Sequence, residues 1–221
     1  MSGPDRRHRL DRRLARRVEG GLVAGVDEAG RGCLAGPVVV AAVVLPADAD
    51  LPGVRDSKLM TPDAREDAYA RIRACGARFA ALAVSPREVD RLNVLHASER
   101  GMERAVERLE RRRRFRAGAV LVDGHRVPAA LGGRGVPLVK GDDRSLCIAA
   151  ASVLAKVLRD RLMRAWSRRY PVYGFERHVG YPTPQHLDAL RRHGPCPLHR
   201  FSFAPVAAAA QPRLDGDLAA E

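Results

Sequence analysis

The architecture of this chain is best read from the segment Val23-Ala24-Gly25-Val26-Asp27-Glu28-Ala29-Gly30-Arg31-Gly32. Residues 22–26 are short, apolar and β-prone, which predicts a buried strand. Two adjacent carboxylates close that strand, although burying a carboxylate without a partner is costly. The glycines that follow permit positive φ and let backbone amides approach an anion closely. Carboxylates beside such a loop indicate a divalent cation between them.

A second carboxylate repeats this arrangement at Leu121-Val122-Asp123-Gly124. Asp123 closes another apolar strand, predicted over 119–122, directly before a glycine turn. Strand-end carboxylates gather at one edge of an α/β sheet, where ligands tend to bind. We therefore expect Asp123 to lie near Asp27 and Glu28.

The long helix predicted from Leu146 to about Arg169 carries a further carboxylate, Asp160. Ser152, Lys156 and Asp160 follow one another at four-residue spacing and share one helix face. A simple Lys156–Asp160 ion pair is the alternative reading of that face. The four candidate carboxylates contain only oxygen donors, which suits Mg²⁺ or Mn²⁺; they are Asp27, Glu28, Asp123 and Asp160.

The remaining segments alternate between strand and helix patterns, which places the chain in the α/β class. Further strands are predicted over 38–45 and 79–84. Helices are predicted over 61–75, with Thr61 as N-cap and Pro62 in the first turn, from Ser85, and over 98–112. The Gly132-Gly133-Arg134-Gly135 stretch is predicted to be a plain loop.

The composition favours a polyanionic partner, since 39 Lys plus Arg against 26 Asp plus Glu give a formal charge of +13. Only three of these cations are Lys, at positions 58, 140 and 156, which favours specific uses for a compact ammonium. The four cysteines include no close pair, so a disulfide framework is not expected and a reducing cytoplasm fits. No apolar run approaches the roughly 20 residues of a membrane span, and we expect no membrane association.

The order and spacing of these motifs closely resemble bacterial ribonuclease HII from about residue 20 to 205. The matching segments are residues 23–32, Ala35-Gly36-Pro37-Val38, Asp56-Ser57-Lys58, Asn93-Val94-Leu95-His96-Ala97, Val122-Asp123-Gly124, Lys140-Gly141-Asp142, residues 150–157, Arg159-Asp160, His178-Val179-Gly180-Tyr181-Pro182-Thr183 and His199-Arg200-Phe201-Ser202-Phe203.

The resemblance implies a ribonuclease H-like fold, with a central mixed five-stranded sheet flanked by helices and a small C-terminal helical segment. It implies that the four carboxylates hold two divalent ions, Mn²⁺ or Mg²⁺, and that Gly30, Arg31 and Gly32 recognise a 2′-hydroxyl. Tyr181 then packs on the next sugar, and Lys58 and Lys156 contact nucleic acid. The implied reaction cuts RNA in RNA·DNA hybrids, including single ribonucleotides in duplex DNA, on their 5′ side, leaving 3′-hydroxyl and 5′-phosphate ends.

The expected organisation has four parts: a basic flexible segment over 1–20, a catalytic core over 21–170, a helical substrate-holding segment over 171–205 and a disordered tail over 206–221. We expect a monomer, with a replication clamp as a possible partner. One alternative is a non-catalytic basic protein that only binds nucleic acid. Another is a zinc cluster formed by His186, His193, Cys196 and His199, although its spacing is tight and interrupted by proline.

Overall fold

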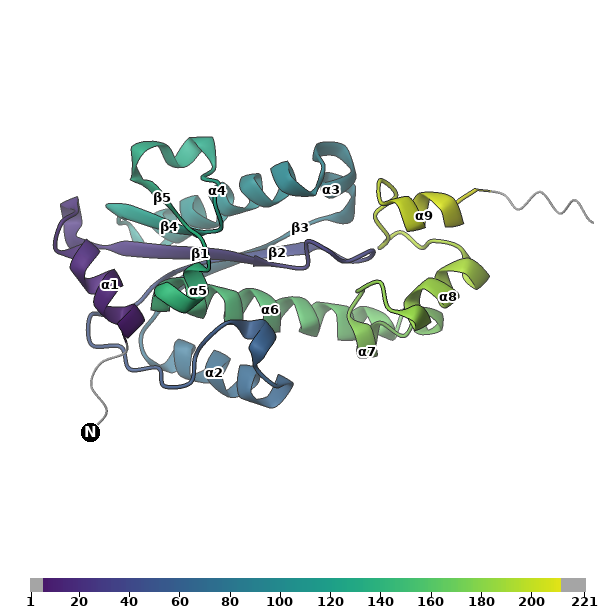
Figure 1. Cartoon of the computed structure of the whole chain (residues 1–221), viewed down its shortest axis with the longest axis horizontal. Helices are drawn as coiled ribbons and strands as arrows, with labels where there is room; N and C mark the ends of the chain where they lie inside the picture. Colours follow the sequence, from purple (N-terminus) through teal and green to yellow (C-terminus); the bar gives the residue numbers. More distant parts are fainter. Residues whose placement is uncertain (1–5, 212–221) are drawn as a thin grey trace, which may run out of the picture.

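The computed structural model describes residues 6–211, and its centre is a five-stranded mixed β-sheet (Figure 1). The strands lie in the order β3-β2-β1-β4-β5. Strand β1 pairs antiparallel with β2 and parallel with β4; β2 and β3 are antiparallel, and β4 and β5 are parallel. The bounds are β1 Val23–Ala29, β2 Val38–Val44, β3 Arg78–Val84, β4 Ala119–Asp123 and β5 Gly135–Leu138. The expected mixed five-stranded sheet is confirmed; β5 itself was not predicted, and it begins at Gly135, the last residue of the predicted loop.

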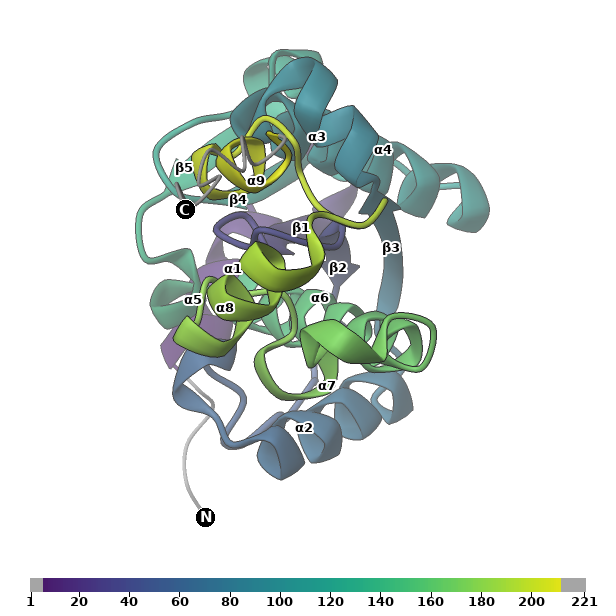
Figure 2. The same cartoon turned by 90° about the vertical axis from the view of Figure 1, so that its right-hand side faces the viewer.

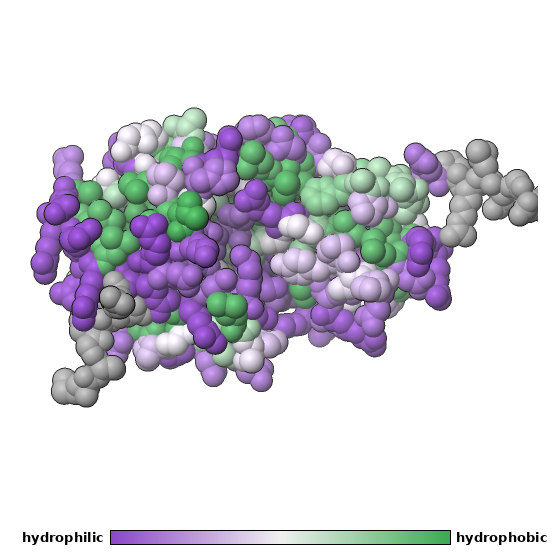
Figure 3. All heavy atoms as spheres, viewed as in Figure 1, coloured by the Kyte–Doolittle hydropathy of each residue, from purple (hydrophilic) through white to green (hydrophobic). Residues whose placement is uncertain are grey.

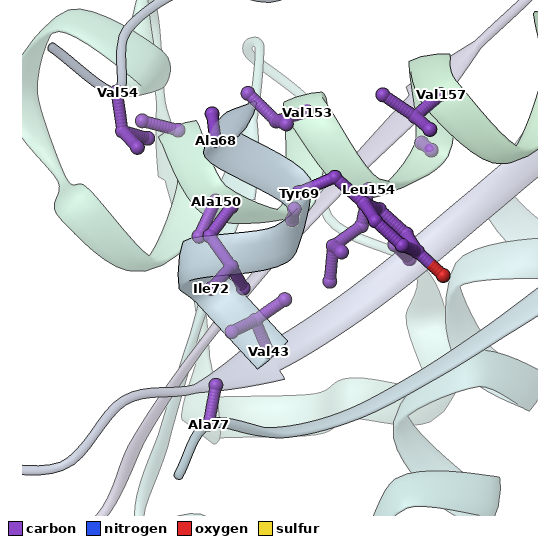
Figure 4. Close-up of a cluster of buried hydrophobic side chains, with 14 of the residues drawn as sticks. Val43, Val54, Ala68, Tyr69, Ile72, Ala77, Ala150, Val153, Leu154 and Val157 are labelled. Carbon is purple, nitrogen blue, oxygen red and sulfur yellow. The ribbon is translucent and has the colours of Figure 1, made fainter. Parts of the chain in front are cut away.

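Helices cover both faces of this sheet, which is why β1 and β2 are almost entirely buried (Figures 1 and 2). The long helix α6 (Leu146–Ser167) and α2 (Pro62–Ala74) pack on one face, and α4 (Val94–Arg113) packs on the other, with α3 (Pro86–Leu92) against it. Figure 4 shows the core between α2, α6 and the sheet, where Ile72, Leu154 and Val43 meet. The buried apolar area on both faces is the main force that holds the layers together.

The helix starts follow the local sequence. Thr61 accepts a hydrogen bond from the Ala64 amide at 3.3 Å, as predicted for the start of α2. Helix α4 begins at Val94, four residues before its predicted start at 98, because Asn93 caps it. The Asn93 side chain accepts hydrogen bonds from the amides of residues 95 and 96, at 3.0 and 3.1 Å.

A helix, α1 (Arg6–Ala15), lies where the sequence predicted a flexible segment. Leu10 and Leu14 pack with Ile148, and Asp11 is buried. Asp11 Oδ2 accepts a hydrogen bond of 3.0 Å from the Cys147 amide in the first turn of α6. The prediction of a flexible segment is therefore corrected for residues 6–15, because two leucines and one acid suffice to attach an otherwise Arg-rich helix. Residues 1–5 lie outside the described part.

The C-terminal segment packs against the loop that follows β1. Its helices are η4 (Pro171–Tyr173), α7 (Phe175–His178), α8 (Pro184–His193) and α9 (Ala204–Ala209). The Leu34 amide donates to the Gly180 carbonyl at 2.9 Å, and the Gly36 amide donates to the Leu198 carbonyl at 2.8 Å. Residues 206–209 continue α9 where a tail was predicted; the rest of the predicted tail, 212–221, lies outside the described residues.

Four short elements complete the described chain: η1 (Glu19–Gly21), η2 (Ser57–Leu59), η3 (Ala129–Arg134) and α5 (Gly141–Arg144). On the face seen in Figure 3, hydrophilic residues dominate around α1 and α5, and hydrophobic residues gather towards α8 and α9. In the described part of the chain, no helix combines the length and apolar character needed to cross a membrane.

Candidate active site

The pairing of β1 with β4 brings two of the predicted carboxylates together. Val26 is opposite Val122 in the parallel register, so Asp27 and Asp123 come next on neighbouring strands. Side chains alternate along a strand, so the face that Gly25 presents is also the face of Asp27. A Cβ on Gly25 would lie 2.3 Å from the Cys147 backbone of α6. Both carboxylates therefore lie on the face covered by the start of α6.

Asp27 and Glu28 are buried among like charges. The Glu28 amide donates to Asp27 Oδ1 at 2.7 Å. Burial raises the pKa of Asp27 well above its ordinary value, and the charges of Glu28 and Asp123 raise it further. Burial also raises the pKa of Glu28, with Asp123 adding to it and Arg31 opposing it. The three side chains therefore form one acidic group, as predicted.

A fourth carboxylate, Asp142, joins this group from the first turn of α5. The Gly141 amide donates to Asp123 Oδ1 at 2.8 Å, which fixes α5 against the end of β4. Burial raises the pKa of Asp142 to about 6, and Asp56 and Asp123 contribute repulsion. The sequence reading left Asp142 out of the candidate set because it does not end an apolar strand. The available signal was the Lys140-Gly141-Asp142 motif itself.

Asp160 has a different environment, since both of its oxygens face cations. Lys156 Nζ lies 2.8 Å from Asp160 Oδ1, and Arg65 Nη2 lies 3.7 Å from Oδ2. The ion pair considered as the alternative is thus present, in a buried setting. Asp160 is therefore paired with two cations, whereas like charges raise the pKa of Asp27 and Asp142.

The donor set fits a divalent cation. Its members are carboxylates whose like charges repel one another. A hard divalent cation bound by their oxygens would relieve that repulsion. Within residues 6–211, no three His, Cys, Asp or Glu side chains are arranged as a ready three-ligand site. The case for a metal therefore rests on donor chemistry and uncompensated charge.

Lys58 lies beside the acidic group. Burial alone would lower the pKa of Lys58, but Asp56, Asp27, Asp142 and Asp123 together raise it. Its backbone amide donates to Asp56 Oδ1 at 2.9 Å, which holds η2 at the rim of the site. Lys58 is exposed, so it adds positive charge from the surface, and Arg31 adds a second one beside Glu28.

The glycine loop adjoins the acidic group, and Tyr181 adjoins Lys156. Arg31 Nη1 lies 3.1 Å from Glu28 Oε1, and the Arg31 side chain is 48% exposed. Lys156 Nζ lies 5.2 Å from the centre of the Tyr181 ring, within range for a cation–π contact. Of the predicted substrate-binding residues, Arg31 and Lys58 therefore lie beside the acidic group, whereas Lys156 and Tyr181 lie together next to Asp160.

Three of the four predicted zinc residues, His186, Cys196 and His199, form a chain of hydrogen bonds instead, and His193 is exposed. His186 Nδ1 lies 2.8 Å from the Tyr181 carbonyl, so this nitrogen must carry the proton. His186 Nε2 is then an acceptor for His199 Nε2 at 3.1 Å. His199 Nδ1 in turn accepts from the Cys196 amide at 3.0 Å. Each ring nitrogen of the two histidines is used in this chain, which leaves no lone pair for zinc.

A mixed five-stranded sheet with acidic residues at the shared end of β1 and β4 defines the ribonuclease H-like class of nucleases. The model of the family described as Ribonuclease HII matches residues 24–206. A ribonuclease HII of Geobacillus kaustophilus is 52% identical over 184 residues, which cover 83% of this chain and 68% of that protein.

Solved structures agree with this assignment. Ribonuclease H2 of Pyrococcus horikoshii superposes with a TM-score of 0.72 at 25% identity, over 86% of this chain and 97% of that one. Ribonuclease HII of Archaeoglobus fulgidus, solved in a complex with PCNA, gives a TM-score of 0.65 at 28% identity, over 87% and 98%. The chain belongs to the ribonuclease HII family and is a ribonuclease H enzyme.

Proposed function

We propose that this protein is a metal-dependent endonuclease that cleaves RNA in RNA·DNA hybrids and at single ribonucleotides embedded in duplex DNA. Cleavage falls on the 5′ side of the ribonucleotide and leaves a 3′-hydroxyl and a 5′-phosphate. The observation that carries the proposal is the mutual repulsion of Asp27, Glu28 and Asp123, which together with burial raises the pKa of Asp27 and Glu28.

Asp27, Glu28, Asp123 and Asp142 would hold two divalent ions, Mg²⁺ or Mn²⁺. When bound, such ions would supply Lewis-acid activation of a water and neutralisation of the leaving oxygen. Asp142 replaces Asp160 in this set, because Asp160 is already neutralised by Lys156 and Arg65. Asp160 would then act indirectly, by keeping Lys156 beside the Tyr181 ring.

The protein's own groups would bind and orient the substrate. The exposed backbone of Gly30, Arg31 and Gly32 can pair with a 2′-hydroxyl, which is the group that distinguishes a ribonucleotide from its neighbours. Tyr181 would pack on the sugar that follows. Lys58 and Lys156 would contact the phosphate backbone, and the +13 net charge would hold the duplex without sequence preference.

The alternative of a non-catalytic nucleic-acid-binding protein is disfavoured by the same acids, because converging negative charges repel phosphate unless a cation lies between them. We propose that the protein acts as a monomer, and a replication clamp is a further candidate partner. Cleavage of a duplex with one ribonucleotide, compared with the same duplex in all-DNA form and with chelator, tests the proposal. A metal-dependent nick 5′ to the ribonucleotide supports it, and no nick in any metal excludes it.

A further inference from the structure

Two arginines, Arg159 and Arg200, are fully buried behind the glycine loop, each with 0% of its surface exposed. Guanidinium groups are rarely buried unless they are paired. Within residues 6–211, however, neither forms an ion pair with an acidic side chain; their hydrogen bonds end on main-chain carbonyls. The two guanidinium groups lose their hydration, and in exchange they hold the backbone carbonyls of the glycine loop and its neighbours in place.

Arg200 holds the part of the loop nearest the acidic group. Its Nη2 donates to the Gly30 carbonyl at 2.7 Å, and its Nη1 donates to the Arg31 carbonyl at 2.8 Å. Its Nε and Nη2 both donate to the Gly36 carbonyl, at 3.1 and 2.9 Å. One planar fork therefore joins both ends of the loop, which a Lys ammonium could not do with the same geometry.

Arg159 holds the other side of the loop and the turn before Tyr181. It donates to the carbonyls of Ala35, Pro37 and Val179, at 3.1, 3.0 and 2.8 Å. Gly30 packs directly on this guanidinium: a Cβ there would lie 1.9 Å from Arg159 Nε. The inner side of the glycine loop therefore packs on the side chains of Arg159 and Arg200.

The direction of the carbonyls determines what the loop presents on its outer side. In a trans peptide the C=O of one residue and the N–H of the next point in opposite directions, and no described peptide bond is cis. Because the carbonyls of Gly30 and Arg31 point inward to Arg200, the amides of Arg31 and Gly32 point outward. Neither amide donates a hydrogen bond within residues 6–211.

The outer side of the loop is open to a ligand. Arg31 and Gly32 are both exposed, and a Cβ built on Gly32 meets nothing within 4 Å. Two unused amides with two buried positive charges behind them form an electropositive surface, which favours an electron-rich oxygen. Burial lowers the pKa of Arg200 to about 10, so its charge persists at neutral pH.

We propose that Arg200 is the positioning residue for ribonucleotide recognition: it turns the carbonyls of Gly30 and Arg31 inward so that the amides of Arg31 and Gly32 face the substrate. Arg200 touches no substrate itself, and its effect passes through the loop. This inference rests on the proposed function, since it explains how the same loop distinguishes a ribonucleotide.

The test compares binding of two duplexes that differ in one 2′-hydroxyl, measured in chelator so that no cleavage occurs. The variants are Arg200→Met, which removes the charge and the fork, and Arg200→Lys, which keeps the charge. Arg134→Met is the matched control. Arg134 is also largely buried and donates a hydrogen bond to a main-chain carbonyl, but that carbonyl, of Ala117, is far from the glycine loop in the sequence. Circular dichroism and thermal unfolding monitor the fold of each variant.

We expect Arg200→Met to lose at least tenfold of the wild-type preference for the ribonucleotide duplex, while its affinity for the all-DNA duplex changes less than twofold. Arg200→Lys should lose most of the preference too, because the bridging geometry is what matters, and it remains informative if Arg200→Met does not fold. Arg134→Met should lower the melting temperature and keep the preference. A folded Arg200 variant with the wild-type preference would overturn this inference alone. A wild-type protein that binds both duplexes equally would overturn the proposed recognition as well.

Discussion

Replacing Asp142 by Asn and replacing Asp160 by Asn should change the stability of the metal-free protein in opposite directions. The pKa of Asp142 rises from 3.8 to about 6 on folding, so the folded state disfavours the ionised form. For an acid with a raised pKa, stability is lost as pH rises through this range, and at pH 7 the whole cost is present. At about 1.4 kcal/mol per pKa unit the cost is about 3 kcal/mol, which screening by solvent reduces to about 1 kcal/mol. Asp142→Asn should therefore stabilise the metal-free protein by about 1 kcal/mol.

Asp160→Asn removes a partner from buried Lys156, which is 9% exposed. Breaking a buried ion pair from one side typically costs about 3 kcal/mol, because the remaining charge is left uncompensated. The effects on activity should be opposite to the effects on stability. Asp142→Asn should lose metal-dependent cleavage, and folded Asp160→Asn should retain it.

Urea unfolding at pH 7 in chelator, followed by cleavage assays in Mg²⁺, measures both effects on the same samples. The wild-type protein in chelator provides the reference for stability. If Asp142→Asn cleaves normally while folded Asp160→Asn is inactive, the assignment of the fourth carboxylate is wrong.

Three further outcomes are expected. Asp27→Asn should abolish cleavage yet leave hybrid binding measurable in a gel-shift assay; metal-dependent turnover in that variant would remove Asp27 from the centre. Burial lowers the pKa of His186 and His199 from 6.5 to about 4, so the free energy of unfolding should fall as pH drops from about 6.5 towards 4, by about 2 kcal/mol per ring at pH 5. Urea titrations at pH 7 and 5 check this, and His186→Gln should flatten the decline. Gly30→Ala should displace Arg159 and lower the melting temperature, measured by calorimetry, by several degrees. Gly53→Ala is the control, because Gly53 also has a positive φ but a Cβ there would meet nothing within 4 Å.

Strong local patterns made much of the fold predictable. The apolar strand that ends at Asp123 and the Thr-Pro start of α2 appear where the sequence placed them, and β1 continues past its predicted end at residue 26 to Ala29. Strand β5 was missed because it has only four residues, begins with glycine and contains a proline. Helix α1 was missed because only two leucines interrupt its Arg-rich sequence. The contact of these leucines with Ile148 is a tertiary contact that the local sequence does not indicate.

The candidate site was predictable to the extent that it follows strand ends. Asp27 and Glu28 lie in the last part of β1 and Asp123 ends β4, and the parallel register of the two strands brings them together. Asp142 joins them through a tertiary hydrogen bond between Gly141 and Asp123, which no periodicity reveals. Asp160 was included among the candidates because it lies four residues after Lys156 on one helix face. The same spacing is typical of an ion pair, which is what the structure contains.

The most direct test of a metal-dependent, ribonucleotide-specific nuclease uses a labelled DNA duplex with one embedded ribonucleotide. With Mg²⁺ or Mn²⁺ the account predicts a single nick 5′ to that ribonucleotide, with a 3′-hydroxyl end, and none in chelator or in the all-DNA duplex. Absence of any metal-dependent nick, or equal cutting of both duplexes, would contradict it.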